Sequence, residues 1–359
     1  MRTVSKVIFS LPNMTAGGAE RVVSILANNL TNSGTKVEIW LYYGSTIHYH
    51  LDERVIIRTL SLLNKTQRQR VKILHNRLVL AKKDDANIVF IPFLSAILQL
   101  SVIANIGTGI PVIACERNNP YIKGSKWYQR IIAQVPFLMA THCVFQTPDA
   151  RAYYSLLRDR KCTIIANPIP ESSYKWEGTV SASKIVSVCR LHKQKNLIMS
   201  LEIIETLRNR FPNIHLDIYG EGDLKDELVC EISKRNLSDY VELKGLTYDV
   251  PLILSHSSVY ISTSDFEGIS NSMLEAMSVG MPIICTDCPI GGARMMLQDD
   301  AGILSPVGDV QSFASSLEKI LLNPHDAKSL GHKAFLVSLK YTDAKIADIW
   351  KSLLNTLLS

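Results

Sequence analysis

Short runs of apolar and β-branched residues alternate along the chain with longer segments in which apolar positions recur at helical spacing. In the first half, the runs that predict strands are residues 4–10, 37–43, 88–91, 112–115, 143–146 and 163–166. In the second half they are residues 184–189, 215–219, 241–243, 259–262 and 282–286. Strands that alternate with helices predict an α/β fold in which helices cover both faces of parallel sheets.

A polar stretch at residues 167–183, rich in Pro, Ser and Lys, separates the two halves and is the predicted linker. The chain has 359 residues, more than one hydrophobic core usually organises. We therefore expect two doubly wound, Rossmann-like domains, residues 1–170 and 171–341, with a final helix at about 342–359 packing back on the first. Such sheets bind ligands at the carboxyl ends of their strands, so we expect the domains to face each other across a cleft.

The composition excludes a disordered chain, because 47% of the residues are hydrophobic and 20% are charged. Pro, Gly and polar residues interrupt the most apolar region, residues 88–113, which predicts a buried strand, helix and strand rather than a membrane span. The N-terminus lacks the pattern of a signal peptide, and seven scattered cysteines favour free thiols. We expect a cytoplasmic location, with Cys285 and Cys288 as two unrelated thiols rather than half of a zinc site.

A glycine turn, Gly17 and Gly18, follows the first predicted strand and opens a helix. The backbone N–H groups at such a helix start can face an anion or a hydroxylated ligand. The alternative is a plain strand-to-helix turn in which Glu20 complements the helix dipole. Spacing alone does not decide between them.

Two cations, Arg190 and Lys195, lie on the predicted loop between the first strand of the second half and its helix. They could clamp a diphosphate, although a solvated basic loop is the alternative. Further on, Gly220 and Gly222 follow a strand, but Lys225 stands where a dinucleotide-binding fingerprint requires a third glycine. This argues against an oxidoreductase and leaves a turn near a nucleotide open.

The most informative stretch predicts a loop with Glu267, then a helix with Glu275, then a stop at Gly280. The two carboxylates could flank one ligand while the N–H groups between them point at its phosphates. The alternative is a capping box in which Ser272 caps the helix and Glu275 folds back on the backbone. The cations at a neighbouring strand end favour the functional interpretation.

These motifs resemble family 4 of the retaining glycosyltransferases, which have the GT-B fold, and the resemblance to the bacterial surface-polysaccharide and lipid-linked oligosaccharide members spans nearly the whole chain. It implies a hexosyltransferase in which Arg190 and Lys195 bind the donor diphosphate and assist catalysis, and Glu267 contacts the transferred sugar. Glu275 would hold the ribose hydroxyls. The remaining implied donor-binding residues are Gly17, Gly18, Gly220, Gly268, Ile269 and Ser270.

The resemblance also implies that no metal or cofactor takes part and that the UDP-sugar is a substrate. The chain contains no D-x-D triplet. In the mechanism proposed for the family, the acceptor attacks from the front face and the departing diphosphate helps to remove its proton. Glu116 and Arg117, in a Glu-Arg-Asn variant of the family's first-domain motif, are candidate acceptor-side residues. Two positions depart from the family pattern: Cys189 replaces a frequent glycine, and the loop at Gly291 lacks its usual glutamate.

Residues 54–83 contain nine lysines and arginines and no acidic residue, interleaved with leucine, isoleucine and valine. Such a basic amphipathic segment could dock on an anionic membrane surface without any spanning helix. A solvated helix face is the alternative, and no nucleic-acid-binding motif accompanies the charge.

We therefore expect a peripheral enzyme on the inner face of the plasma membrane that builds O-antigen-like or capsule-like polysaccharide. It would transfer a hexose or N-acetylhexosamine to a glycan or a polyprenyl-diphosphate-linked glycan. The alternatives are a UDP-sugar epimerase or hydrolase on the same fold, and a non-catalytic, membrane-docked partner that only binds the nucleotide sugar.

Overall fold

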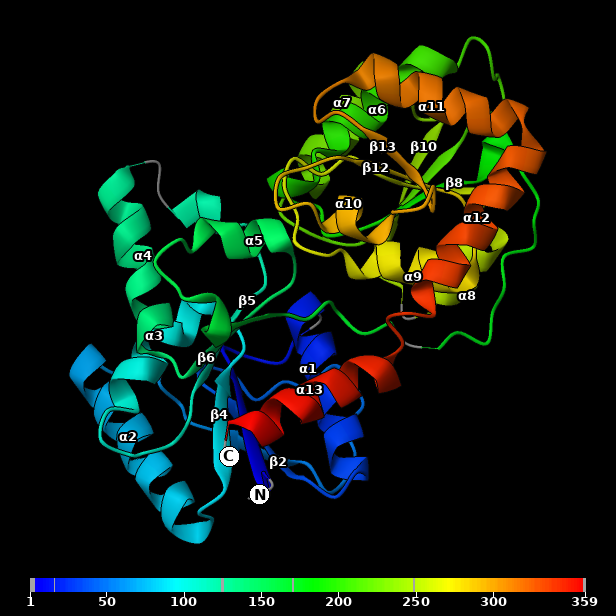
Figure 1. Ribbon diagram of the computed structural model, residues 1–359. Coiled ribbons are helices and arrows are strands. Elements are labelled where there is room, and N and C mark those ends of the chain that lie inside the picture. The colour runs from blue at the N-terminus through cyan, green and yellow to red at the C-terminus, as the bar shows by residue number, and fades with distance from the viewer. Residues whose placement is uncertain (1–3, 16, 124–125, 170, 248, 358–359) are drawn as a thin grey trace. The chain divides into compact units, whose positions relative to one another are not determined.

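The computed structural model describes residues 4–357 except 16, 124, 125, 170 and 248. The chain divides into two compact units (Figure 1). Unit 1 comprises Met1–Pro168 and Asp343–Ser359, and unit 2 comprises Ile169–Thr342. The expected boundary after residue 170 lies two residues from this division, and residue 170 itself lies outside the described residues.

Unit 1 contains two parallel sheets. The first has the strand order β3-β2-β1-β4 and the second β5-β6-β7, and an isolated bridge between Phe90 and Val112 links them. The strands are β1 (Lys6–Leu11), β2 (Lys36–Leu41), β3 (Ile56–Thr59), β4 (Ile88–Pro92), β5 (Ile113–Glu116), β6 (His142–Phe145) and β7 (Cys162–Ile164). Every residue of β1, β4, β5 and β6 is buried, as their largely apolar sequences predict.

The helices of unit 1 are α1 (Gly18–Asn32), α2 (Gln67–Asp84), α3 (Ser95–Ala104), α4 (Trp127–Met139), α5 (Pro148–Tyr153) and α13 (Asp343–Thr356), with the short 3₁₀ turns η1 (Pro120–Lys123) and η2 (Asp159–Lys161). The last of these helices, α13, comes from the end of the chain and packs against α1. Its Trp350 is buried, with its ring 6.3 Å from that of Phe93. The aromatic contact thus anchors the C-terminal helix in the first unit.

Unit 2 is a single six-stranded parallel sheet with the order β10-β9-β8-β11-β12-β13. Its strands are β8 (Ile185–Val188), β9 (Leu216–Tyr219), β10 (Val241–Gly245), β11 (Val259–Ser262), β12 (Ile283–Thr286) and β13 (Ile303–Ser305). Its helices are α6 (Leu197–Leu207), α7 (Lys225–Lys234), α8 (Val250–His256), α9 (Asn271–Val279), α10 (Gly292–Met296), α11 (Val310–Leu322) and α12 (Pro324–Ser338), with the 3₁₀ turns η3 (Ala182–Lys184) and η4 (Lys193–Lys195). The strand order reverses between β8 and β11, and in such sheets ligands bind at this point.

Two strands were not predicted. The edge strand β3 is half exposed along its length, and β13 is only three residues long, so neither forms a long apolar run. The expected strand, helix and strand at residues 88–113 are confirmed as β4, α3 and β5. Among the helices of the described residues, none combines the length and apolar character needed to cross a bilayer.

Candidate active site

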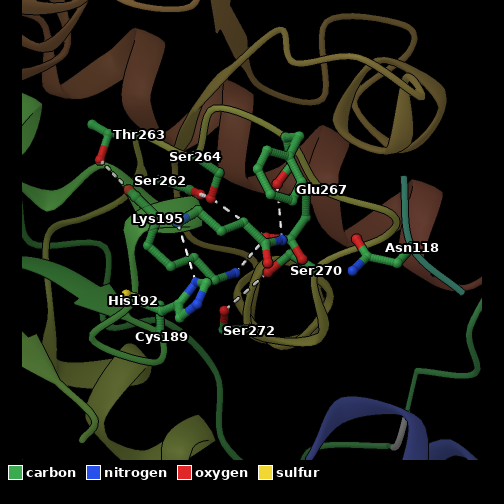
Figure 2. Close-up of polar contacts among 12 residues, drawn as sticks. Asn118, Cys189, His192, Lys195, Ser262, Thr263, Ser264, Glu267, Ser270 and Ser272 are labelled. Carbon is green, nitrogen blue, oxygen red and sulfur yellow. Dashed lines mark hydrogen bonds and ion pairs between the residues drawn. The ribbon is translucent and has the colours of Figure 1, made fainter. Parts of the chain in front are cut away.

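The candidate site lies in unit 2, where two neighbouring strands end. Strand β8 leads through η4 into α6, and β11 leads through a loop into α9. The two strands pair in parallel, with Val259 opposite Ile185, so their carboxyl ends reach the same edge of the sheet. Figure 2 shows the polar side chains that the two loops bring together there.

Lys195 and Glu267 form an ion pair between these loops (Figure 2). Their side chains are only 11% and 20% exposed, respectively. Burial lowers the pKa of Lys195, but the Glu267 carboxylate beside it outweighs this, so the pKa is raised above its ordinary value. Lys195 is therefore a permanent cation at this strand end over the physiological pH range.

Side-chain hydrogen bonds join the two loops around this pair. The Asn196 side-chain amide donates to Asp265 Oδ1 at 2.7 Å, and the Gln194 amide donates to the Phe266 carbonyl at 2.9 Å. Thr263 Oγ1 donates to the Lys195 carbonyl at 3.0 Å. Because each loop is bonded to the other, the charged groups are held in place before any ligand arrives, which is the arrangement that stabilises developing charge most strongly.

Arg190 lies in the same loop as Lys195 and has a different environment. Its side chain is exposed, and no ion pair to it is found within the part of the chain that the structure describes. Its charge opposes protonation of Lys195, which indicates that the two cations lie near one another. An anion between them would gain charge-assisted contacts from both.

Helix α9 begins at Asn271, with Ser270 as its N-cap. The capping-box alternative for Ser272 and Glu275 is therefore wrong, because Ser272 is already the second helical residue. Its hydroxyl instead lies 2.9 Å from the Tyr260 hydroxyl and 3.1 Å from that of Ser270. The Ser270 side chain makes no cap hydrogen bond, and the positive end of the helix dipole lies at this helix start, a few residues after Glu267.

Glu275 lies within the buried part of α9 and is 4% exposed. All its helical neighbours from Met273 to Val279 are buried as well. Burying a carboxylate is unfavourable unless other groups hydrogen-bond it, so this position in an apolar helix requires polar contacts. The structure thus buries Glu275 in unit 2, on the helix that follows the loop with Glu267, and its ribose-binding role stays a prediction.

Gly268 and Ile269 are buried, and the loop before α10 lies directly against them. A Cβ on Gly292 would come within 1.7 Å of the Gly268 carbonyl oxygen, so only glycine fits there. This loop lacks its usual glutamate, so its motif predicts no ligand contact. Its close packing shows that the loop supports the backbone beside Glu267.

A small pocket of about 10 Å³ lies between this loop and the strand ends. It is lined by Ser262, Ser264, Glu267, Gly268, Ser270, Met273, Cys285, Thr286, Cys288 and Ala293. The two cysteines are free thiols, as expected. Burial raises the pKa of Cys288 to about 12 and that of Cys285 further, so both thiols stay protonated at neutral pH.

Gly220 follows β9 with φ +138°, and a Cβ there would lie 1.8 Å from the Cys189 carbonyl oxygen. The glycine therefore allows the end of β9 to pack against the Arg190 loop. This backbone contact explains why glycine is needed at the position, and its contact with a donor stays a prediction.

The predicted glycine turn in unit 1 shows a different arrangement. Gly17 is the N-cap of α1, and a Cβ on it would lie 2.1 Å from Glu20 Oε2. A carboxylate of the chain itself thus lies over the turn, at the positive end of α1. This favours the plain strand-to-helix interpretation for Gly17 and Gly18.

Glu116 is almost fully buried at the end of β5 and bonds the protein around it. Its Oε1 accepts from the Arg117 N–H at 3.1 Å and from Ser95 Oγ at 3.3 Å, and Oε2 accepts from the Tyr154 hydroxyl at 2.5 Å. Burial, followed by the nearby Glu116, raises the pKa of Tyr154. These contacts give Glu116 a structural role whether or not it also meets an acceptor.

The Arg117 guanidinium lies over the Phe93 ring, 4.1 Å from its centroid, and 5.8 Å from that of Trp350. One nitrogen donates to Asn167 at 3.4 Å, while Nε and Nη2 have no hydrogen-bond partner among the described residues. Burial lowers the pKa of Arg117. The side chain is thus held by aromatic rings and keeps donors available.

One group in the described part of the chain could hold a metal ion, namely His215 directly before β9, Asp217 on β9 and Glu242 on β10. Lys244 pairs with both acids, at 2.5 Å from Glu242 and 3.5 Å from Asp217. A lysine thus occupies the position that a cation would take.

Comparison with known proteins assigns the fold and the class. Over 98% of this chain and 99% of the other, the structure matches the crystal structure of Anabaena HepE in complex with UDP and glucose, with a TM-score of 0.80 and 16% identity. The fold is GT-B, as predicted. Residues 175–336 match the family model of the group 1 glycosyl transferases. The chain is therefore a glycosyltransferase whose second unit carries the group 1 domain, which confirms the resemblance inferred from its motifs.

Two curated relatives match along nearly their whole length. An uncharacterized glycosyltransferase from Haemophilus influenzae is 23% identical over 98% of this chain and 100% of its own. The second, from Campylobacter jejuni, is named GalNAc-alpha-(1->4)-GalNAc-alpha-(1->3)-diNAcBac-PP-undecaprenol alpha-1,4-N-acetyl-D-galactosaminyltransferase. It is 25% identical over 97% of this chain and 98% of its own.

Proposed function

We propose that this glycosyltransferase transfers a hexose or an N-acetylhexosamine from a UDP-sugar to an acceptor sugar, with retention of the anomeric configuration. The observation that carries the proposal is the pairing of Lys195 with Glu267 at the ends of β8 and β11, beside the exposed cation Arg190. UDP and glucose in the structurally similar HepE support this choice of donor.

In the proposed reaction, Arg190, Lys195 and the start of α9 bind the diphosphate, and no metal ion is required. The bond between the anomeric carbon and the diphosphate oxygen breaks as the acceptor oxygen bonds to the same face of the sugar. The acceptor proton passes to the departing diphosphate. Two cations and a helix N-terminus would supply the charge stabilisation that a metal supplies elsewhere.

Glu267 would contact the transferred sugar, with the ion pair to Lys195 holding its carboxylate in place. Ser264 Oγ also donates to Glu267 Oε2, at 3.4 Å. A carboxylate held by two donors can stabilise positive charge that develops at the anomeric carbon. Glu275 and the backbone of residues 268–270 would complete the donor site.

The proposed acceptor is a glycan on a polyprenyl diphosphate, used to assemble surface polysaccharide on the inner face of the plasma membrane. The name of the Campylobacter relative, which contains PP-undecaprenol, supports this class of acceptor. The basic segment at residues 54–83 would face the anionic lipids. The protein itself binds some of its cations: Arg58 pairs with Glu38 at 2.8 Å, and Arg70 donates to the Leu62 carbonyl at 3.0 Å.

Three apolar residues of α2, namely Leu74, Leu78 and Ala81, are buried, whereas Leu80 is exposed. This helix therefore supplies mainly charge to the surface. Its proposed contribution to membrane binding is electrostatic and should weaken as salt is added.

The test is transfer of labelled sugar from a panel of UDP-sugars into solvent-extractable lipid, using membranes of the source organism and the purified protein. Label in the lipid with one donor, lost in Glu267→Ala, supports the proposal and identifies the sugar. Conversion of donor without any acceptor would instead indicate an epimerase or a hydrolase. Nucleotide binding with no turnover, unaffected by Glu267→Ala, would indicate the non-catalytic partner.

A further inference from the structure

Helix α4 of unit 1 presents an apolar face to solvent. Trp127 and Ile132 are 73% and 64% exposed. Five more large apolar side chains of this helix are also exposed, namely Tyr128, Ile131, Val135, Leu138 and Met139. At 3.6 residues per turn, these seven positions fall within a sector of about 140° on one side of the helix. We call them the α4 apolar face.

The polarity of α4 is inverted relative to an ordinary surface helix. Its inner side carries Phe137 and the polar residue Gln134, both at least 96% buried. Gln134 accepts from the Leu156 N–H at 3.0 Å, so the polar group is used inside the unit. Soluble proteins rarely expose a contiguous apolar patch of this kind unless another surface covers it.

The charges around the face indicate what covers it. Residues 118–148 contain no aspartate or glutamate, and Lys126 and Arg130 flank the exposed aromatic rings. The Lys126 ammonium lies 5.9 Å from the Tyr128 ring centroid, and the Arg130 guanidinium 5.7 Å from that of Tyr121. Aromatic rings beside basic groups are the composition of segments that lie in a membrane interface.

The net charges of the two units also favour an anionic surface as the partner of unit 1. Unit 1 has 23 lysines and arginines against 11 aspartates and glutamates, a net charge of +12, while unit 2 has 16 against 22, a net charge of −6. An anionic surface thus attracts the unit that carries the α4 apolar face. A second copy of unit 1 would bring two strongly positive bodies together, which favours a lipid surface over self-association.

We propose that the α4 apolar face inserts into the interface of an anionic bilayer, with Trp127 and Ile132 among the acyl chains and Lys126 and Arg130 at the headgroups. This inference deepens the proposed transfer at a membrane. Only the use of the contact in that transfer rests on the proposed function. It adds an apolar insertion surface to the electrostatic contribution proposed for residues 54–83.

The experiment compares the full chain with the double variant Trp127→Ser/Ile132→Ser, which leaves net charge unchanged. The control is Val229→Ser, at an exposed apolar position of α7 in unit 2. Binding is measured by sedimentation with vesicles of phosphatidylcholine and phosphatidylglycerol. We expect the double variant to bind at least about tenfold more weakly, because two large apolar side chains no longer leave water. The control should bind like the unchanged protein.

Insertion also predicts that brominated lipids quench the fluorescence of Trp127. This is the part of the tryptophan emission that the variant Trp127→Phe lacks. Equal vesicle binding by the double variant, or no such quenching, would overturn the proposal. A dimer that becomes a monomer in the double variant, with no change in vesicle binding, would show that a second copy covers the face.

UDP binding, measured on the same proteins, separates this inference from the proposed reaction. The unchanged protein and the double variant should bind UDP equally, since α4 lies in unit 1 and the proposed donor site lies in unit 2. Loss of vesicle binding by the double variant would support the inference even if neither protein transferred sugar, in which case only the proposed reaction would fail.

Discussion

The Lys195 ammonium and the Glu267 carboxylate form an ion pair between the loops that follow two adjacent parallel strands, and solvent reaches little of either side chain. Neither group belongs to the other's local sequence, since 72 residues separate them. The pair exists because β8 and β11 are neighbours at the point where the strand order of the sheet reverses. Glu267 thus stands beside a fixed cation, at the position where this fold binds ligands.

Replacing Lys195 with alanine should abolish most transfer. The variant leaves a partly buried carboxylate without its partner and removes a donor from the developing diphosphate charge. We expect a loss of at least about 100-fold in kcat and a decrease of about 1–3 kcal/mol in the free energy of unfolding. Initial rates of sugar transfer and urea denaturation measure the two effects.

The control for this prediction is Lys225→Ala, which breaks a pair with Glu221 whose side chains are 49% and 41% exposed. Exposed pairs contribute little, so its stability should change by less than about 0.5 kcal/mol and its transfer rate should not change. Equal effects of the two variants would contradict the special position of Lys195.

Arg190→Ala should weaken donor binding without destabilising the fold. Its side chain is exposed and has no ion pair within the described part of unit 2, so its loss removes no native contact of that kind. We expect UDP to bind about tenfold more weakly, since one charge-assisted contact contributes about 1.5–3 kcal/mol. Isothermal titration calorimetry with UDP measures this.

Lys193, an exposed cation of the same loop, provides the matched control for Arg190. Lys193→Ala should leave UDP affinity within about twofold if position rather than total charge decides binding. An equal loss in both variants would mean that the loop acts only through its net charge.

Most of the strands that could be predicted are buried. Strands such as β1, β4 and β12 are buried along their whole length and contain runs of apolar residues, so the local pattern suffices to find them. The edge strand β3 is stabilised by pairing with β2, and half of its surface meets solvent, so its sequence lacks this signal. Pairing of this kind depends on residues distant in the chain, which a local pattern does not contain.

The candidate site likewise has parts that a local pattern predicts and parts that depend on residues distant in the chain. Arg190, Lys195 and Glu267 could be identified because loops after strands carry ligands in this class of fold. Ser272 and Glu275 have the spacing of a capping box, so the local pattern also allows Ser272 as the N-cap of α9. The helix instead begins two residues earlier, with Ser270 as its N-cap. The support that Gly292 gives to Gly268 is a contact between distant loops, and no spacing rule predicts it.

Gly292→Ala should disturb this support. The new methyl group would lie 1.7 Å from the Gly268 carbonyl oxygen, so one of the two backbones must move. We expect the unfolding free energy to fall by at least about 2 kcal/mol and transfer to fall with it, because Glu267 precedes Gly268. Urea denaturation and initial rates at saturating donor check both.

Gly308→Ala is the control, because Gly308 has φ +75° and no atom within 4 Å of an added Cβ. It introduces backbone strain of about 1–2 kcal/mol without a steric clash and should leave transfer unchanged. A larger effect at Gly308 than at Gly292 would contradict the close packing of the two loops.

His142 should make the stability of the protein depend on pH below neutrality. It is buried on β6 with Nε2 2.8 Å from Thr163 Oγ1, and burial, with a smaller contribution from Lys161, lowers its pKa below 6.5. Since the unfolded chain then binds a proton more readily than the folded one, this contribution is present above the unfolded pKa and is lost as pH falls through the folded pKa. Between about pH 7 and pH 5, the unfolding free energy of His142→Gln should therefore decrease less than that of the unchanged protein.

Because carboxylates titrate in both proteins, the difference between their pH profiles isolates the contribution of the histidine. The control His325→Gln, at a position 97% exposed, should reproduce the profile of the unchanged protein. Parallel profiles for all three proteins would mean that His142 is protonated equally in the folded and unfolded states.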